Sequence, residues 1–321
     1  MMTKKQIYNI YFLINPDMHL LDMAGPSQAF HEANYREQLF NLHYVSFAPT
    51  ITSWQGLQLT ALSIPPKKLP DNSIVIVCAS KYENDIFDDS FSNKSITWLQ
   101  QVSKTDALII GVCTGTFLLG KAGILNGLEC TTHHTLTKKL AELYPKAQVK
   151  EDCIYVQSGS IYTTAGVTSG IDLCLKIIEL LIDTQCSIRV ARELVVHRRR
   201  MANDPQFSTH LSCRNHISPI IHSVQDYVSN HLNEKFTITD ICKIFNISPR
   251  HLQRLFKEHT NITLRDYITS LRLAEAKSLL ENSKTIEEAA YQAGFAQPAS
   301  LREAWKKHYG NLPRSNIISQ I

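Results

Sequence analysis

Along residues 1–200, near-continuous apolar runs alternate with segments whose apolar positions recur at helical spacing. An apolar run without polar alternation suits a strand that is covered on both faces, as in a parallel sheet flanked by helices. The alternation therefore predicts an α/β domain built on a mainly parallel sheet. The predicted strands are 7–14, 41–48, 73–80, 106–113 and 161–166, and the predicted helices are 26–36, 92–103, 114–122, 135–143 and 170–182.

The pattern changes after Arg200, where a polar stretch containing Pro205 loses the helical period. From residue 217 onward only helical periods remain, without strand patterns. Polar segments that contain proline commonly join domains. We therefore expect an α/β domain at 1–200, a linker at 201–216 and an all-α domain at 217–321.

The last third of the chain contains two copies of one sequence unit. Each copy starts with a threonine followed three residues later by an acid, which is the signature of a capping box at a helix start. A residue suited to a left-handed turn comes next, Asn246 in the first copy and Gly294 in the second. In the first copy Ser248 and Pro249 then mark the start of another helix. Two helices joined by a tight turn form a helix-turn-helix, so we predict two such units.

The second helix of each unit carries polar side chains suited to DNA on its outer face. A helix fits the major groove, where Arg pairs with guanine and Gln with adenine, while Lys contacts phosphates. On one isolated helix these side chains would indicate only a solvated face, but the duplication favours DNA binding. We expect residues 264–283 to form one helix that holds the two units apart. The candidate DNA-binding residues are Ser248, Arg250, His251, Gln253, Arg254, Lys257, Gln297, Ser300, Arg302, Lys306 and Lys307.

Residues 217–314 resemble the DNA-binding domain of the AraC-type transcriptional regulators. The matching stretches are ISPRHLQRLFKEHTNIT (247–263), LRLAEAKSLL (271–280) and IEEAAYQAGF (286–295). The chain departs from the family pattern at Asn261, where Gly is usual, at Leu264, where Pro is usual, and in LREAW (301–305). The resemblance implies that promoter DNA is a partner.

The stretch DALIIGVCTGTFLLG (106–120) places Cys113 where an apolar strand turns into a helix. Gly111 and Gly115 leave room for a tight turn and for close packing of the helix on the strand. Cys113 would then lie above the carboxyl ends of the strands, where open α/β sheets bind ligands. The amides of Thr114 and Gly115 begin the helix and favour an anion or a thiolate there.

Residues 7–182 resemble the ThiJ/PfpI branch of the class I glutamine-amidotransferase-like superfamily. The matching stretches are LLDMAGPSQAF (20–30), GVCTGTFLLGKAGILNG (111–127), TTHH (131–134) and YTTAGVTSGIDLCLKIIE (162–179). The resemblance implies a flavodoxin-like sheet with a cysteine at a strand-to-helix elbow. It implies that Asp22 matches an acid that approaches the thiol in related cysteine enzymes. Thr114 follows the cysteine as in isocyanide hydratases, and His133 matches a histidine near the site in some members.

Four roles are open for Cys113. It is a nucleophile assisted by Asp22, Thr114 and His133, which would make the chain a cysteine-dependent hydrolase or hydratase; or it lines a pocket for a small effector; or it is an oxidation sensor; or it is a buried structural residue. Fusion to a DNA-binding domain favours the effector pocket, because a bound ligand can shift the protein between DNA-competent and incompetent states. We therefore expect a transcriptional regulator and not an enzyme. The expected ligand-binding residues are Asp22, Cys113, Thr114, Gly115 and His133.

Charge and cysteine content narrow the remaining classes of partner and cofactor. Residues 211–321 hold 14 Lys and Arg against 10 Asp and Glu, so they carry the whole formal excess of +4, which fits a DNA-binding end. The eight cysteines form no C-x-x-C pair, so we expect neither a zinc site nor another cofactor. No apolar run is long enough to cross a membrane. We expect a cytoplasmic homodimer, and the family resemblance implies an amino acid or amine compound as effector.

Overall fold

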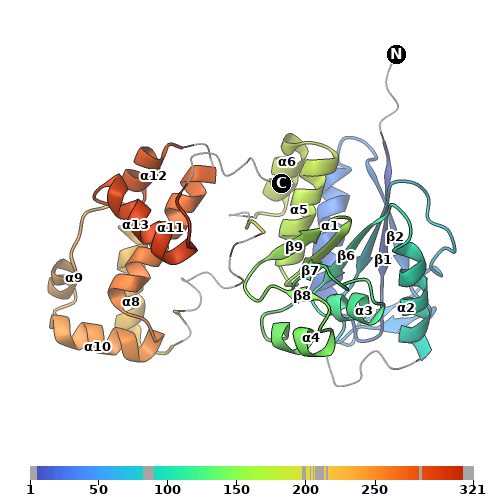
Figure 1. Cartoon of the computed structure of the whole chain (residues 1–321), viewed down its shortest axis with the longest axis horizontal. Helices are drawn as coiled ribbons and strands as arrows, with labels where there is room; N and C mark the ends of the chain where they lie inside the picture. Colours follow the sequence, from blue (N-terminus) through green and yellow to red (C-terminus); the bar gives the residue numbers. More distant parts are fainter. Residues whose placement is uncertain are drawn as a thin grey trace, which may run out of the picture. The chain divides into compact units, whose positions relative to one another are not determined.

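The computed structural model describes residues 6–81, 90–196, 200–202, 204, 206, 213–214, 216–281 and 284–313. The chain divides into two compact units, Met1–Gln206 and Phe207–Ile321 (Figure 1). The linker at 201–216 stays a prediction, since several of its residues lie outside the described ones.

The first unit is built on a six-stranded sheet with the strand order β2-β1-β5-β6-β10-β9. All neighbours pair in parallel except β9 and β10, which are antiparallel. This arrangement confirms the predicted α/β class with a mainly parallel sheet. The strands of the sheet are β1 (Tyr8–Leu13), β2 (Phe40–Val45), β5 (Ser73–Val77), β6 (Leu108–Val112), β9 (Tyr155–Ser158) and β10 (Ile161–Thr164). Two small ladders pair β3 (Ile51–Thr52) with β4 (Gln58–Leu59) and β7 (Glu129–Cys130) with β8 (Gln148–Val149).

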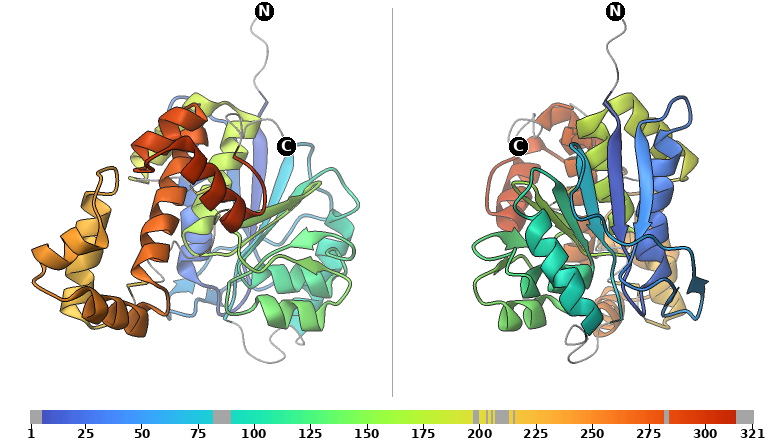
Figure 2. Two further views of the ribbon diagram at one scale, coloured as in Figure 1. Left: turned by 60° about the vertical axis from the view of Figure 1, so that its left-hand side comes forward. Right: turned by 90° about the vertical axis from the view of Figure 1, so that its right-hand side faces the viewer.

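Helices cover both faces of this sheet (Figure 2). Alternate residues of β1 enter different cores, as the period of a strand requires. Ile10 and Phe12 pack in the core that includes α1, α5 and α6, whereas Tyr11 and Leu13 pack in the core that includes α2, α3 and α4. These helices are α1 (Leu20–Ala33), α2 (Ser90–Val102), α3 (Gly115–Lys121), α4 (Thr137–Leu143), α5 (Ser169–Leu181) and α6 (Thr184–Glu193).

Helix α1 begins at Leu20, ahead of the start that Pro26 predicted. Pro26 therefore lies inside the helix, where it removes one backbone hydrogen bond. A Cβ atom added at Gly170 of α5 would lie 3.3 Å from the Pro26 ring, so the two helices pack closely at this point. Tertiary packing of α1, with Phe30 fully buried, outweighs the missing bond.

The second unit contains only helices and their connections in its described part. Each predicted capping box is present: Thr237 pairs with Asp240, and Thr285 pairs with Glu288. The helices are α8 (Pro219–Asn230), α9 (Ile238–Ile244), α10 (Pro249–Thr260), α11 (Leu264–Glu281), α12 (Ile286–Gln292) and α13 (Pro298–Tyr309). The pairs α9–α10 and α12–α13 are the two predicted helix-turn-helix units.

Helix α11 is shared between two separate cores in this unit. Its first half contributes Leu264 and Tyr267 to a core with α8, α9 and α10. Its second half contributes Ala276 and Leu280 to a core with α12 and α13. Figure 1 shows the helix among both groups. With 18 residues it is about 27 Å long, so it joins the two helix-turn-helix units through one continuous rod.

Candidate functional site

Cys113 lies at a strained elbow between β6 and α3. Its φ of 53° is left-handed, which is uncommon for a residue other than glycine. The Cys113 N–H donates to the Thr164 carbonyl at 2.9 Å, and its carbonyl accepts from Thr132 Oγ1 at 2.8 Å. Strand β10 and the loop after β7 therefore hold the elbow from two sides.

The glycines around the cysteine permit this turn to sit close to the sheet. A Cβ atom at Gly115 would lie 2.2 Å from the Val77 carbonyl oxygen, and one at Gly111 would lie 2.9 Å from Leu119 Cδ1. Any larger residue at 115 would push α3 off strand β5. The predicted role of both glycines in close packing thus agrees with the geometry.

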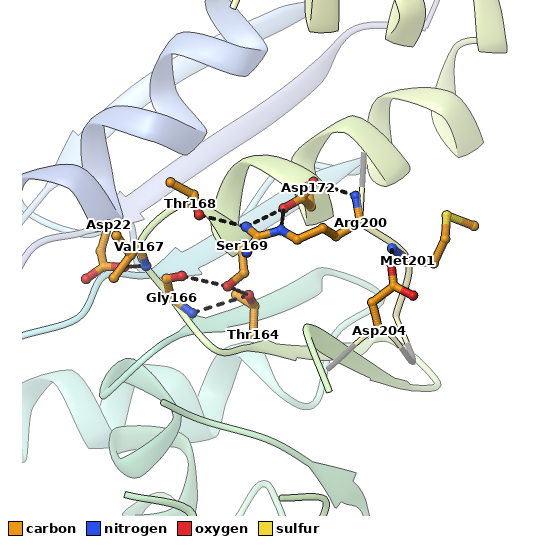
Figure 3. A network of polar contacts seen from close by, with 10 residues as sticks. All are labelled: Asp22, Thr164, Gly166, Val167, Thr168, Ser169, Asp172, Arg200, Met201 and Asp204. Carbon is orange, nitrogen blue, oxygen red and sulfur yellow. Dashed lines mark hydrogen bonds and ion pairs between the residues drawn. The ribbon is translucent and has the colours of Figure 1, made fainter. Parts of the chain in front are cut away.

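Asp22 and Cys113 come together across Gly166. A Cβ atom added at Gly166 would lie 2.9 Å from Cys113 Sγ and 3.0 Å from Asp22 Oδ1. Asp22 is 2% exposed, and it accepts a hydrogen bond from the Val167 N–H (Figure 3). Burial raises the pKa of Asp22, against the opposing effects of that hydrogen bond and of His19. We call Asp22, Cys113, Gly166 and the amides of Thr114 and His133 the Cys113 site.

The thiol in this site is held in its protonated form. Burial raises the pKa of Cys113 to about 12, and the nearby Asp22 adds to the shift. The backbone amides of Thr114 and His133 face the sulfur and act in the opposite direction. The stabilisation that the start of α3 offers to a thiolate is therefore present, but burial outweighs it.

The two other predicted catalytic side chains are engaged elsewhere. Thr114 Oγ1 donates to the carbonyl of Ser80 and accepts from its N–H at 2.9 Å, so it ties the elbow to the segment that follows β5. His133 Nδ1 lies 2.8 Å from Thr135 Oγ1, and its ring packs 4.2 Å from the His134 ring. Burial, followed by His134 and His19, lowers the pKa of His133.

Several residues around the site were missed by the sequence analysis. Gly166 and Val167 stand in the quoted stretch YTTAGVTSG, but nothing in the sequence indicates that they face Cys113. Arg200 pairs with Asp172, and Gln206 donates to the Thr132 carbonyl at 2.8 Å. Of these residues, only Gly166 offers a signal in the sequence, because glycine favours the positive φ that this position adopts in the structure, 88°.

The first candidate DNA interface lies on α10. Ser248 caps this helix, with its Oγ accepting from the His251 N–H at 3.3 Å. Leu252 and Phe256 are fully buried on one side, whereas the predicted DNA-binding residues of this helix are exposed. A groove of about 710 Å³ follows α10 and the start of α11. It is lined by Ile238, Arg250, Gln253, Arg254, Lys257, Thr263, Leu264 and Arg265.

The second candidate interface lies on α13. Leu301 and Trp305 are buried, and the predicted residues Gln297, Ser300, Arg302, Lys306 and Lys307 are exposed. One arginine in each interface has an internal acidic partner. Arg254 lies 2.9 Å from Glu258, and Arg302 lies 3.1 Å from Glu287. Such exposed pairs contribute little stability, so either arginine can exchange its partner for DNA.

The described residues hold no group of three or more His, Cys, Asp or Glu side chains arranged for a metal ion. All eight cysteines are buried and none forms a disulfide. Among the described helices, none has the length and apolar character needed to cross a bilayer.

Comparisons with known proteins cover both units. Residues 8–180 match the family model described as DJ-1/PfpI family, and residues 241–315 match a helix-turn-helix domain. The HTH-type transcriptional regulator GlxA of Rhizobium meliloti is 27% identical over 323 residues, covering 97% of this chain and 96% of GlxA. The isonitrile hydratase of Pseudomonas putida is 27% identical over 188 residues, which cover 58% of this chain and 77% of the hydratase.

A solved structure has a related fold. The AraC family transcriptional regulator from Pseudomonas putida matches with a TM-score of 0.52 at 18% identity, covering 58% of this chain and 99% of that one. A family model thus accounts for more than half of the chain, and a regulator matches nearly its whole length. The chain belongs to the DJ-1/PfpI family, and it is an AraC-type DNA-binding transcriptional regulator with an amino-terminal DJ-1/PfpI domain.

Proposed function

We propose that the first unit binds a small effector at the Cys113 site and, without catalysis, alters how the second unit binds promoter DNA. The observation that carries this proposal is the convergence of a buried acid, a protonated thiol and two backbone amides at a strained elbow. These groups can donate and accept hydrogen bonds to a polar ligand. In a chain that also binds DNA, such a site has a regulatory use.

An enzymatic role is the second candidate, because the isonitrile hydratase of Pseudomonas putida is similar to this unit and Asp22 lies beside Cys113. Three features favour ligand binding over catalysis. The thiol pKa is raised, whereas nucleophilic cysteines have lowered values. The hydroxyl of Thr114 is bonded to Ser80, and the ring of His133 is bonded to Thr135. The same raised pKa opposes an oxidation sensor, since oxidation requires thiolate character.

In the second unit, α10 and α13 enter successive major-groove segments of promoter DNA. Arg250, Gln253 and Arg302 contact bases, and the lysines farther along each helix contact phosphates. The capping boxes and the shared helix α11 support this placement, because they fix both helices within one unit. The proposal includes a cytoplasmic homodimer and an effector that is an amino acid or a small amine.

DNase footprinting of the full chain on its own upstream region tests the proposal. We expect a protected segment with two adjacent half-sites, and a change in affinity when the effector is present among added amino acids and amines. Cys113→Ala is expected to remove the response to the effector while leaving effector-free DNA binding within twofold of wild type. Protection that never changes with any compound, together with hydration of an isonitrile that Cys113→Ala abolishes, would favour the enzyme instead.

A further inference from the structure

Residues 200–206, which immediately precede the second unit, are bonded to the first unit at both ends. We call them the anchored segment; positions 200, 201, 202, 204 and 206 are described. At its start, Arg200 donates to Asp172 through its backbone N–H at 3.0 Å and through Nε at 2.8 Å. Its Nη2 donates to Thr168 Oγ1 at 2.7 Å (Figure 3). The Asp172 side chain is only 4% exposed.

The rest of the segment is held as closely. The Ala202 carbonyl accepts from the Ile154 N–H at 3.0 Å, and Gln206 Nε2 donates to the Thr132 carbonyl at 2.8 Å. Asp204 closes a turn within the segment, accepting from the Met201 N–H at 2.9 Å. Arg200, Ala202 and Gln206 are thus each bonded to other parts of the first unit.

Two loops that contribute to this anchoring, at Thr168 and Thr132, also form the Cys113 site. In the loop after β10, Gly166 abuts Cys113 and Val167 bonds Asp22, while Thr168 bonds Arg200. In the loop after β7, Thr132 bonds the Cys113 carbonyl through its hydroxyl and Gln206 through its carbonyl. Each loop therefore contacts the site with one group and the anchored segment with another.

Steric crowding makes the first of these loops sensitive to what occupies the site. A single added carbon at Gly166 would collide with Cys113, 2.2 Å from its Cβ, and would crowd Asp22 at 3.0 Å. A ligand that enters between these groups must shift the loop, because neither side offers free space at Gly166. Displacement of Val167 and Thr168 would then move one of the two side chains that Arg200 binds, the other being Asp172.

We propose that the anchored segment transmits effector occupancy of the Cys113 site to the DNA-binding unit. The contacts that transmit it are the bond of Arg200 to the loop after β10 and the bond of Gln206 to the loop after β7. This inference rests on the proposed function, since it requires an effector at the site. It adds a set of contacts that joins the Cys113 site to residues just before the second unit. Coupling requires that ligand binding and DNA binding both bias such contacts.

Gly166→Ala tests the inference without a known ligand, because the added methyl group crowds the site directly. Gly159→Ala is the matched control: Gly159 also has a positive φ, of 62°, but nothing lies within 4 Å of its added Cβ. For the segment itself, Arg200→Gln is compared with Arg192→Gln, which removes the same charge from an exposed position of α6. Thr168→Val is a milder change, at an exposed residue, that removes one contact of Arg200.

Two properties of each variant are measured in the full chain. The first is amide hydrogen exchange of residues 200–206 by mass spectrometry. We expect at least tenfold faster exchange in Gly166→Ala, Arg200→Gln and Thr168→Val, and less than a twofold change in both controls. The second is affinity for the upstream fragment defined by footprinting. Gly166→Ala should change it at least fivefold in the wild-type background and less than twofold when Arg200→Gln is present.

The outcomes separate the two proposals. Unchanged exchange in the folded Thr168→Val and Gly166→Ala variants overturns the coupling through the anchored segment. An affinity change of equal size with and without Arg200→Gln also overturns it, and leaves the proposed effector function standing. If Gly166→Ala does not fold, Thr168→Val decides through exchange. Failure of the wild-type chain to protect any DNA overturns the proposed function itself, whatever the exchange shows.

Discussion

Replacement of Gly294 by alanine tests how the two helix-turn-helix units are joined. Gly294 has a φ of +82°, and an added Cβ would lie 2.1 Å from the Leu232 carbonyl oxygen and 2.9 Å from Arg272 Nε. Arg272, on α11, donates to the carbonyls of Leu232 at 3.3 Å and Glu234 at 3.1 Å. The turn between α12 and α13, in the second helix-turn-helix unit, therefore packs on the loop after α8, and Arg272 holds that loop in place. An alanine at 294 must displace both.

The expected loss of stability follows from two contributions. A left-handed backbone costs an alanine about 1–2 kcal/mol relative to glycine. Displacing Arg272 removes hydrogen bonds from a charged donor, worth about 1.5–3 kcal/mol. We expect Gly294→Ala to lower the free energy of unfolding of the second unit by about 2.5–5 kcal/mol. Gly310→Ala, where φ is +76° and nothing lies within 4 Å, should lose only the backbone contribution of about 1–2 kcal/mol.

Amide exchange of α9 and α12 in the full chain measures these free energies separately from those of the first unit. Gly294→Ala should also weaken DNA binding, because the two recognition helices lose their fixed separation, whereas Gly310→Ala should bind as wild type does. Equal destabilisation by the two substitutions would refute the packing argument, since only the backbone strain would then remain.

Three further predictions concern the cap, the DNA interface and the thiol. Thr285→Ala should cost about 1 kcal/mol in urea denaturation at pH 7. Hydrogen bonds from Thr285 lower the pKa of the Glu288 carboxyl from its ordinary 4.5, so the part of the cap that depends on this carboxylate is present above that value and is lost as the pH falls through the lower folded pKa, whereas the bond from the Glu288 N–H to Thr285 Oγ1 remains. Arg250→Ala should weaken specific DNA binding by roughly 1–3 kcal/mol in fluorescence anisotropy at fixed salt, and unchanged preference for the footprinted sequence would contradict its contact with bases. Alkylation of Cys113 by iodoacetamide at pH 8 should be slower than that of free cysteine and faster in Asp22→Asn, because removing the nearby carboxylate charge lowers the thiol pKa; identical rates in the two proteins would show that Asp22 does not act on the sulfur.

What could be predicted from the sequence depended on how local its cause was. The capping boxes at Thr237 and Thr285 were predictable because cap and acid are three residues apart. The sheet was predictable because buried parallel strands leave uninterrupted apolar runs. The start of α1 was not, since the burial that outweighs Pro26 comes from a distant helix. The Arg200–Asp172 pair has no local pattern either, because 28 residues separate its members.

Two of the eight described non-glycine residues with a positive φ lie at the Cys113 site, and their location supports a functional role for the loop after β10. Cys113 and Val167 both have a φ of 53°, and Gly166 between Cys113 and Asp22 has a φ of 88°. A β-branched residue such as Val167 is a marked outlier there, and each such residue costs on the order of 1–3 kcal/mol. The bonds of the elbow with Thr164 and Thr132, and the bond that the Val167 N–H donates to Asp22, hold these conformations in place. A cysteine that only filled the core would need none of them, because a relaxed turn could bury the same sulfur.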